Sequence, residues 1–256
     1  MSDVSTFLAG LQAELDASTA RDATFLGQAL ARSLKRASTV RTLFMEASFT
    51  FMTTALQQDY PTGRRPGTLP YVGPTPAITP PAGYVVGVPP DFQEMDSFYV
   101  LAGSTFGLPG IPIRRGTIEQ IRASALRVVF AGIYTGLWTF HHEAILLGPT
   151  PAGAQQLAGD YLRDATRDAA TGALITGASG SGISNPWFTE GEFALRALVM
   201  RDFHRGNSKD AQQADWFDEE WKEACSIFST AVSQAKSASA QAPPSFGEEN
   251  PLAGIW

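Results

Sequence analysis

The chain has 256 residues, of which 44% are hydrophobic and 17% are charged, and this composition is typical of a globular protein rather than a disordered one. A formal net charge of -6 argues against a protein that wraps nucleic acid, but it is compatible with a surface that DNA passes without sticking. We expect no membrane contact, because no apolar run approaches the ~20 residues that cross a bilayer and the first residues do not resemble a signal peptide.

The first 47 residues are predicted to form two helices. The spacing of Leu8, Leu11 and Leu15 predicts a first helix over residues 5–17, and Thr19 can cap a second one. Apolar and small residues then alternate at spacings of four and three, which predicts a helical seam as far as residue 47. The members of the seam are Leu26, Leu30, Ser33, Ala37, Val40, Phe44 and Ala47. The bases Arg32, Lys35, Arg36 and Arg41 lie mostly off the seam, on a solvated face or at a contact with another subunit.

Residues 48–183 are predicted to be rich in β-structure. Aromatic and β-branched residues indicate a strand over 48–53, and further strands are expected at 84–88, 98–101, within 126–147 and at 155–162. One or two helical turns are expected over 117–125, and the glycine-rich residues 172–182 are expected to form a flexible return to the helices.

A proline-rich loop over residues 61–83 interrupts these strands. It contains seven prolines and has no periodicity, and a loop of this length inside a compact domain usually serves a function or acts as an interaction arm. Arg64 and Arg65 at its start could bind an acidic neighbour or a phosphate. The alternative is that both arginines are merely solvated.

Two further helices are predicted between residues 185 and 235. Thr189 and Glu192 have the spacing of a capping box, and Phe188 and Phe193 have that of a hydrophobic staple. This first helix is apolar on nearly every side, so it should be central, and Gly206-Asn207 should end it. The next helix has a heptad seam made of Ala214, Phe217, Trp221, Ala224, Phe228, Ala231 and Ala235.

An acidic cluster lies mainly off this last seam. It is made of Asp215, Asp218, Glu219, Glu220 and Glu223. It is interpreted as a solvated face or as an edge for a basic partner, and the bases between Arg32 and Arg41 could supply that partner in the same molecule or in a neighbour.

The predicted fold class is therefore α+β. We expect a four-helix bundle formed by the N-terminal pair (residues 1–47) and the C-terminal pair (residues 184–236), with residues 48–183 as a small inserted β-rich domain. Residues 237–256 follow as an extended tail, which is either a docking peptide or a frayed terminus.

No active site, metal site or cofactor site is predicted. His141, His142 and Glu143 are the best candidates for metal or acid–base chemistry, but adjacent residues on a strand point to opposite faces and chelate one ion poorly. A histidine pair exposed at a turn is the simpler interpretation. The lone Cys225 excludes an internal disulfide, fits a reducing compartment and has no cysteine partner for zinc. We expect the protein not to be an enzyme, and a metal-dependent hydrolase is the alternative.

Three short motifs occur in an order that suggests a family. They are Val88-Pro89-Pro90-Asp91-Phe92, then Pro149-Thr150-Pro151, then Asn185-Pro186-Trp187 with Ala194-Leu195. Taken together over residues 49–228, this set resembles the head-to-tail (portal) adaptor proteins of tailed phages, which include the tail tubular adaptors of short-tailed phages. The proline-rich loop departs from the family pattern because it is longer than expected.

The resemblance implies a structural virion protein in the neck or tail, made in the host cytoplasm. The family forms a ring, commonly dodecameric, that joins the portal protein to the tail nozzle and lets DNA pass through without specific recognition. It implies no catalysis and no cofactor. In that role, Arg64 and Arg65 would contact a ring neighbour or the nozzle, and the tail would dock on the portal or an adjacent subunit. The tail residues expected to make this contact are Phe246, Leu252, Ile255 and Trp256. Another neck or minor tail protein is the alternative within the virion.

Overall fold

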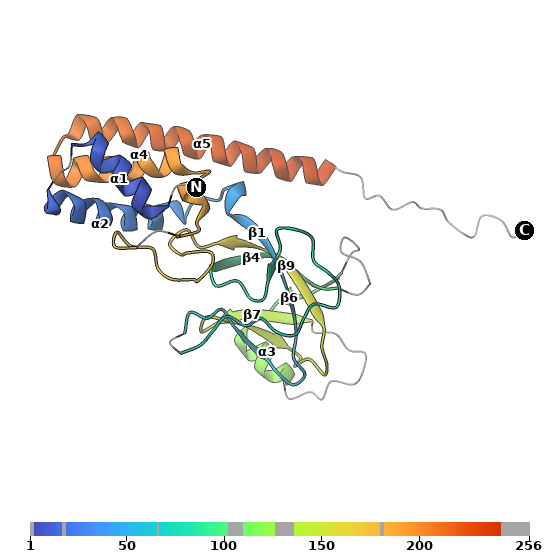
Figure 1. Ribbon diagram of the computed structural model, residues 1–256. Helices are drawn as coiled ribbons and strands as arrows, with labels where there is room; N and C mark the ends of the chain where they lie inside the picture. The colour runs from blue at the N-terminus through green and yellow to red at the C-terminus, as the bar shows by residue number, and fades with distance from the viewer. Residues whose placement is uncertain are drawn as a thin grey trace, which may run out of the picture.

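The computed structural model describes residues 3–16, 19–65, 67–101, 110–125, 136–179 and 182–241. In these residues the chain is α+β, with a helical layer at one end and two mixed β-sheets at the other (Figure 1). The helices are α1 (Val4–Glu14), α2 (Ala20–Ala37), α3 (Ile118–Ala125), α4 (Glu192–Phe203) and α5 (Ala211–Gln241). None of the helices described here has both the length and the apolar character needed to span a bilayer.

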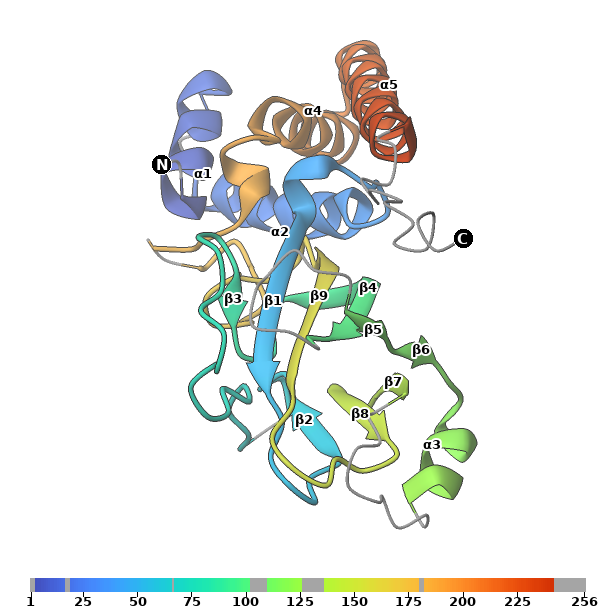
Figure 2. The same ribbon diagram turned by 90° about the vertical axis from the view of Figure 1, so that its right-hand side faces the viewer.

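The expected four-helix bundle with a small β insertion is wrong. The two sheets are substantial and bury a core of their own, and the helices are too unequal to form a matched bundle. α5 has 31 residues whereas α1 has 11 and α4 has 12, and α1 crosses the other helices of the layer rather than running beside them (Figure 2). The helices of the two chain ends nevertheless share one apolar core, centred on Leu30, Trp187 and Leu198.

The second helix starts as predicted but ends ten residues early. Thr19 caps α2 by accepting a hydrogen bond from the Asp22 amide at 3.1 Å, which confirms the predicted start. α2 ends at Ala37, and a 3-10 turn, η1 (Leu43–Met45), then leads directly into a strand. Phe44 still reaches the helical core from this turn, where its ring lies 5.1 Å from that of Trp187. A seam residue can thus pack against the core without the helix that its spacing predicts.

The predicted capping box and staple before α4 are also wrong. Asn185 accepts the Trp187 amide at 3.0 Å and starts a 3-10 turn, η2 (Pro186–Phe188), so the first helical hydrogen bonds form there instead. α4 then begins after Gly191, where a Cβ atom would lie 2.5 Å from the Trp187 ring, and Phe193 is 54% exposed. The predicted central position of this helix is confirmed, because its buried residues include Leu195, Ala197 and Met200, which point to different sides of the helix. The helix ends earlier than predicted, in a π-helical turn, η3 (His204–Ser208).

The predicted seam of α5 holds only in its first half. Ala214, Phe217 and Ala224 are buried, but Ala235 is exposed and Val232 is buried in its place. A straight helix has 3.6 residues per turn, so a strict heptad drifts away from its partner by ~20° in each repeat. α5 continues to Gln241, past the expected end of the helix.

The basic residues of α2 find a different partner from the predicted acidic cluster. Arg32 and Arg36 lie 3.5 and 3.4 Å from the Asp202 carboxylate of α4. Asp218 of the cluster binds Arg201 instead, at 2.8 Å, and Arg201 is buried between the two helices. The interaction suggested within one molecule is therefore not formed in the described residues.

The two sheets pack on each other around an aromatic core. The five-stranded sheet has the order β3-β1-β9-β4-β5, and the four-stranded sheet has the order β2-β8-β7-β6. Their bounds are β1 (Glu46–Met52), β2 (Asp59–Pro61), β3 (Val85–Val86), β4 (Phe92–Val100), β5 (Ile111–Pro112), β6 (Arg114–Arg115), β7 (Leu137–His141), β8 (Ala144–Gly148) and β9 (Gln156–Arg163). Phe49 and Phe98 from the first sheet meet Trp138 from the second in one buried cluster. The strand predicted at 98–101 is the end of the longer β4. Of the strands predicted within 126–147, the part over residues 126–135 lies outside the described residues.

The chain from β9 to η2 is tied in place rather than free. The Asp168 carboxylate accepts the amides of Thr171 and Ser184 at 3.0 and 2.8 Å, and Asn185 donates to the carbonyls of Ala165 and Arg167. These bonds fix the segment that carries the sheets onto the helical layer, so the described part of the predicted flexible return is anchored at both ends.

Asp168 gives a prediction for the pH dependence of stability. Burial alone would raise the pKa of its carboxyl, but the hydrogen bonds from Thr171 and Ser184 outweigh burial and hold the pKa below its ordinary value of 3.8. A carboxyl with a lowered folded-state pKa stabilises the fold above its unfolded pKa, and this contribution is lost as the pH falls through the folded pKa. Asp168→Asn should therefore lower the free energy of unfolding by about 1–2 kcal/mol at pH 7.

The measurement is urea unfolding of both proteins between pH 7 and pH 2. The difference in free energy of unfolding between wild type and Asp168→Asn should shrink as the pH falls below 3.8. A constant difference across this range would show that the charge of Asp168 contributes nothing.

Candidate functional site

The sequence-predicted arginines lie in a tight turn, not in a loose arm. The turn follows β2 and is closed by a bridge between Thr62 and Pro70. Gly63 has a φ of +83°, and a Cβ atom there would lie 2.4 Å from the Pro70 ring, so the turn requires glycine. Both arginines are consequently held in place against the sheets.

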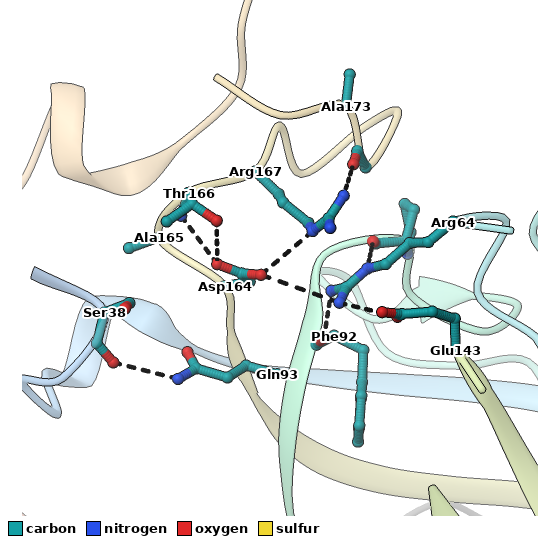
Figure 3. A network of polar contacts seen from close by, with 12 residues as sticks. Ser38, Arg64, Phe92, Gln93, Glu143, Asp164, Ala165, Thr166, Arg167 and Ala173 are labelled. Atoms are coloured by element: carbon teal, nitrogen blue, oxygen red, sulfur yellow. Dashed lines mark hydrogen bonds and ion pairs between the residues drawn. The ribbon is translucent and has the colours of Figure 1, made fainter. Parts of the chain in front are cut away.

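Arg64 is buried and joins three parts of the β-structure (Figure 3). Its side chain is 7% exposed, and it donates to the Pro90 carbonyl at 2.7 Å, to the Phe92 carbonyl and to the Glu143 carboxylate at 3.3 Å. Asp164, at the end of β9, lies 3.9 Å away. Arg64 thus connects the proline-rich loop to the start of β4 and to the β7–β8 turn.

The charge of Arg64 is balanced by carboxylates around it. Burial and the neighbouring Arg167 lower the pKa of the Arg64 guanidinium, while Glu143 and Asp164 oppose that change. Arginine remains protonated in proteins despite such shifts. Arg167 in turn binds Asp164 at 3.2 Å, so two cations and two carboxylates alternate through this network.

Arg65 holds the turn between β7 and β8. It donates to the carbonyls of His141 and His142 and binds the Asp59 carboxylate at 3.1 Å. His142 and Glu143 both have positive φ, as in a type I′ hairpin turn. We name Arg64 and Arg65, with these acceptors, the arginine clamp. The clamp fixes the proline-rich loop to the hairpin.

The arginine clamp forms one wall of an open hollow of about 580 Å³. Its lining includes Arg122 from α3 and the two adjacent histidines, whose ring centroids lie 3.9 Å apart. Loss of hydration and the positive charges of His142, Arg122 and Arg65 lower the pKa of His141. The carboxylates of Asp59 and Glu143 also line the hollow and pair with Arg65 and Arg64, so Arg122 is left as the arginine of this lining that has no ion pair within the described residues.

The hydrolase alternative gains no support from this geometry. Glu143 binds Arg64, and the described residues contain no group of three or more His, Cys, Asp or Glu side chains suited to a metal ion. His204 lies apart on the π-helical turn, where its Nδ1 contacts the Ser208 hydroxyl at 3.0 Å. The histidine pair does lie at a hairpin turn, as the simpler interpretation expected.

Sequence reasoning missed a second buried charged group. Asp91 is buried, accepts the Tyr161 hydroxyl at 3.0 Å and lies 3.7 Å from Arg163, and its charge also acts on Arg64. Burial raises the pKa of the Asp91 carboxyl, and the charge of Arg163 opposes this rise. Its only signal in the sequence was its place in the motif Val88-Pro89-Pro90-Asp91-Phe92.

The predicted tail contacts lie outside the described residues. Phe246, Leu252, Ile255 and Trp256 all follow Gln241, the last residue described. Their role, like that of the arginine clamp in binding another protein, stays a prediction. Comparison with protein-family models and with curated proteins found no match.

Proposed function

We propose that this chain is a structural virion protein that joins the portal of a tailed phage to its tail as one subunit of a ring. The proposal is supported chiefly by the positions of the three motifs that resemble the adaptor family. Each motif lies at a joint of the fold. The carbonyls of Pro90 and Phe92 accept from the arginine clamp, and the Pro151 carbonyl accepts the Leu56 amide at 2.9 Å.

The third motif joins the sheets to the helices. Asn185 starts η2 and donates to the carbonyls of Ala165 and Arg167, while Trp187 is fully buried in the helical core. Residues that hold the layers together are those that a shared architecture requires, so the motif set is consistent with a shared fold as well as a shared order.

The shape also suits a connector. A ring subunit needs a rigid body and extended segments that reach its neighbours, because several weak contacts made together give high avidity. α5, with 31 residues, is about 46 Å long at 1.5 Å per residue and runs well past α4 (Figure 1). The proposed docking residues Phe246, Leu252, Ile255 and Trp256 follow the overhanging end of this helix.

A truncation tests the proposed tail contact. A chain ending at Gln241 keeps α5 whole, so it should unfold at the same temperature as the full chain. It should fail to join purified portal particles, because large apolar side chains at an interface supply much of its binding energy. Co-sedimentation of each chain with portal particles measures this difference.

A substituted full-length chain is the matched control. Replacing Phe246, Leu252, Ile255 and Trp256 with serine should abolish portal binding as the truncation does. Undiminished binding by both variants would remove the tail from the proposal. If the unaltered chain fails to bind portal particles at all, the adaptor function itself is wrong.

A further inference from the structure

One face of α5 exposes large apolar and acidic side chains. Trp216 and Ile227 are 57% and 55% exposed, and Glu220 and Glu223 lie between them. The spacings of four, three and four place these residues on one stripe of the helix, separate from the buried seam through Phe217 and Ala224. We call these four residues, together with the flanking Glu219, the α5 stripe.

The acids of the α5 stripe have no cationic partner among the residues that the structure describes. Asp215 and Asp218 pair with Arg205 and Arg201, but Glu219, Glu220 and Glu223 form no ion pair in the part of the chain that the structure describes. An exposed tryptophan next to uncompensated carboxylates is the composition of an interface, since tryptophan is enriched at binding hot spots.

A complementary surface lies on the sheets. β5 and β6 each form one edge of their sheets, and they carry the exposed residues Ile111, Arg114 and Arg115. Arg122 is exposed on α3, which packs beside β7 and β8. Within the described ranges none of these arginines forms an ion pair, although Glu119 on the same helix offsets part of the charge of Arg122. We call Ile111, Arg114, Arg115 and Arg122 the basic edge.

The two surfaces lie apart in one molecule. α5 is the outermost helix at one end, and α3, with β6 leading to it, lies toward the other end in both views (Figures 1 and 2). They can therefore meet only between copies. A contact between two different surfaces is heterologous, and it repeats around a ring when its rotation closes.

We infer that the α5 stripe of one copy docks on the basic edge of a second copy of this chain. Carboxylates would meet guanidinium groups while Trp216 and Ile227 cover apolar surface around Ile111. This inference rests on the proposed ring and assigns its subunit contact. The attraction between exposed charges weakens with ionic strength, so the contact should be sensitive to salt.

Charge reversal of each surface tests the inference. Glu219→Lys with Glu223→Lys should weaken self-association of the full chain at least about tenfold at low salt, a change of about 1.4 kcal/mol. Arg114→Glu with Arg115→Glu should do the same. All four substitutions in one chain should restore association, because the two surfaces become complementary again. Sedimentation velocity over a concentration series measures each constant.

Two controls guard against misfolding and general charge effects. Lys35→Glu with Glu190→Lys reverses exposed charges outside both surfaces and should leave association unchanged. Glu219→Gln with Glu223→Gln should weaken association less than reversal does, and it replaces the lysine variant if that variant unfolds.

The outcomes separate the contact from the function. The contact is wrong if reversal variants associate like wild type, if the combined variant is not restored, or if the wild type stays monomeric at high concentration and low salt. Wild-type binding to portal particles would still uphold the adaptor role in each of these cases. Failure of the wild type to bind the portal would reject the adaptor role. The self-association measurements would still test the contact between copies in that case.

Discussion

Trp187→Ala is expected to lower the free energy of unfolding by about 3–5 kcal/mol. The indole is fully buried, and its ring lies 5.1 Å from Phe44, 6.2 Å from Trp221 and 5.9 Å from Phe228. These neighbours come from η1 and α5, so the cavity would open where the two ends of the chain meet. Urea unfolding followed by circular dichroism measures the loss.

Two further substitutions test whether the loss of stability comes from the buried ring of Trp187. Trp187→Phe should lose less free energy of unfolding than Trp187→Ala, because an aromatic ring still fills most of the space. The indole N–H that it removes has no hydrogen-bond partner in the described structure. Trp216→Ala, at an exposed position, should change stability by no more than about 0.5 kcal/mol. Equal effects of the two alanine substitutions would mean that Trp187 is not at the centre of the helical core.

Arg64→Met is expected to cost about 3 kcal/mol of folding free energy. Methionine fills the space of the aliphatic chain but leaves the carbonyls of Pro90 and Phe92 without their donor and Glu143 without its cation. Arg64→Lys keeps the charge but not the planar fork that reaches several acceptors at once, so it should lose an intermediate amount.

The matched control for Arg64 is Arg122→Met. Arg122 is exposed and forms no hydrogen bond or ion pair within the described ranges, so its loss should alter stability by at most about 0.5 kcal/mol. If Arg64→Met unfolds like wild type but binds portal particles poorly, Arg64 acts as the partner contact that the sequence suggested. Loss of stability would instead make it a structural residue of the proline-rich loop.

Local patterns predicted the elements whose signals are local. Thr19 lies where its hydroxyl can accept an amide three residues on, and it does cap α2. The apolar residues around Leu198 predicted a central helix, and aromatic and β-branched residues marked β1. These signals depend on neighbours within one or two turns, but short range alone is not sufficient, because the predicted capping box of Thr189 and Glu192 does not start α4.

Patterns that need a distant partner misled the prediction. The seam through Val40 and Phe44 continued in sequence, although the helix stopped at Ala37 and Phe44 reached the core from a 3-10 turn. The sequence predicted only a small β-rich domain. The larger sheet forms because β9 pairs with both β1 and β4, which lie far from it in the chain, and no local pattern shows this pairing. Spacing alone shows which residues are apolar, but not which backbone conformation buries them.

The arginine clamp shows the same limit at the candidate site. The sequence placed Arg64 and Arg65 together beside a proline-rich loop, yet their acceptors lie as far away as Glu143, 79 residues along the chain. No local spacing encodes such a contact. Whether an arginine is solvated, buried or available to a partner is decided by what the fold brings next to it.

The sequence by itself therefore determined the order of helical and β-rich segments, the start of α2 and the first half of the apolar face of α5, because each follows from short-range spacing. Only the tertiary structure decided where α2 ends, how the two sheets are ordered and that Arg64 is buried among its own chain's carbonyls. These features depend on contacts between residues far apart in the chain, and such contacts form only when the whole chain has folded.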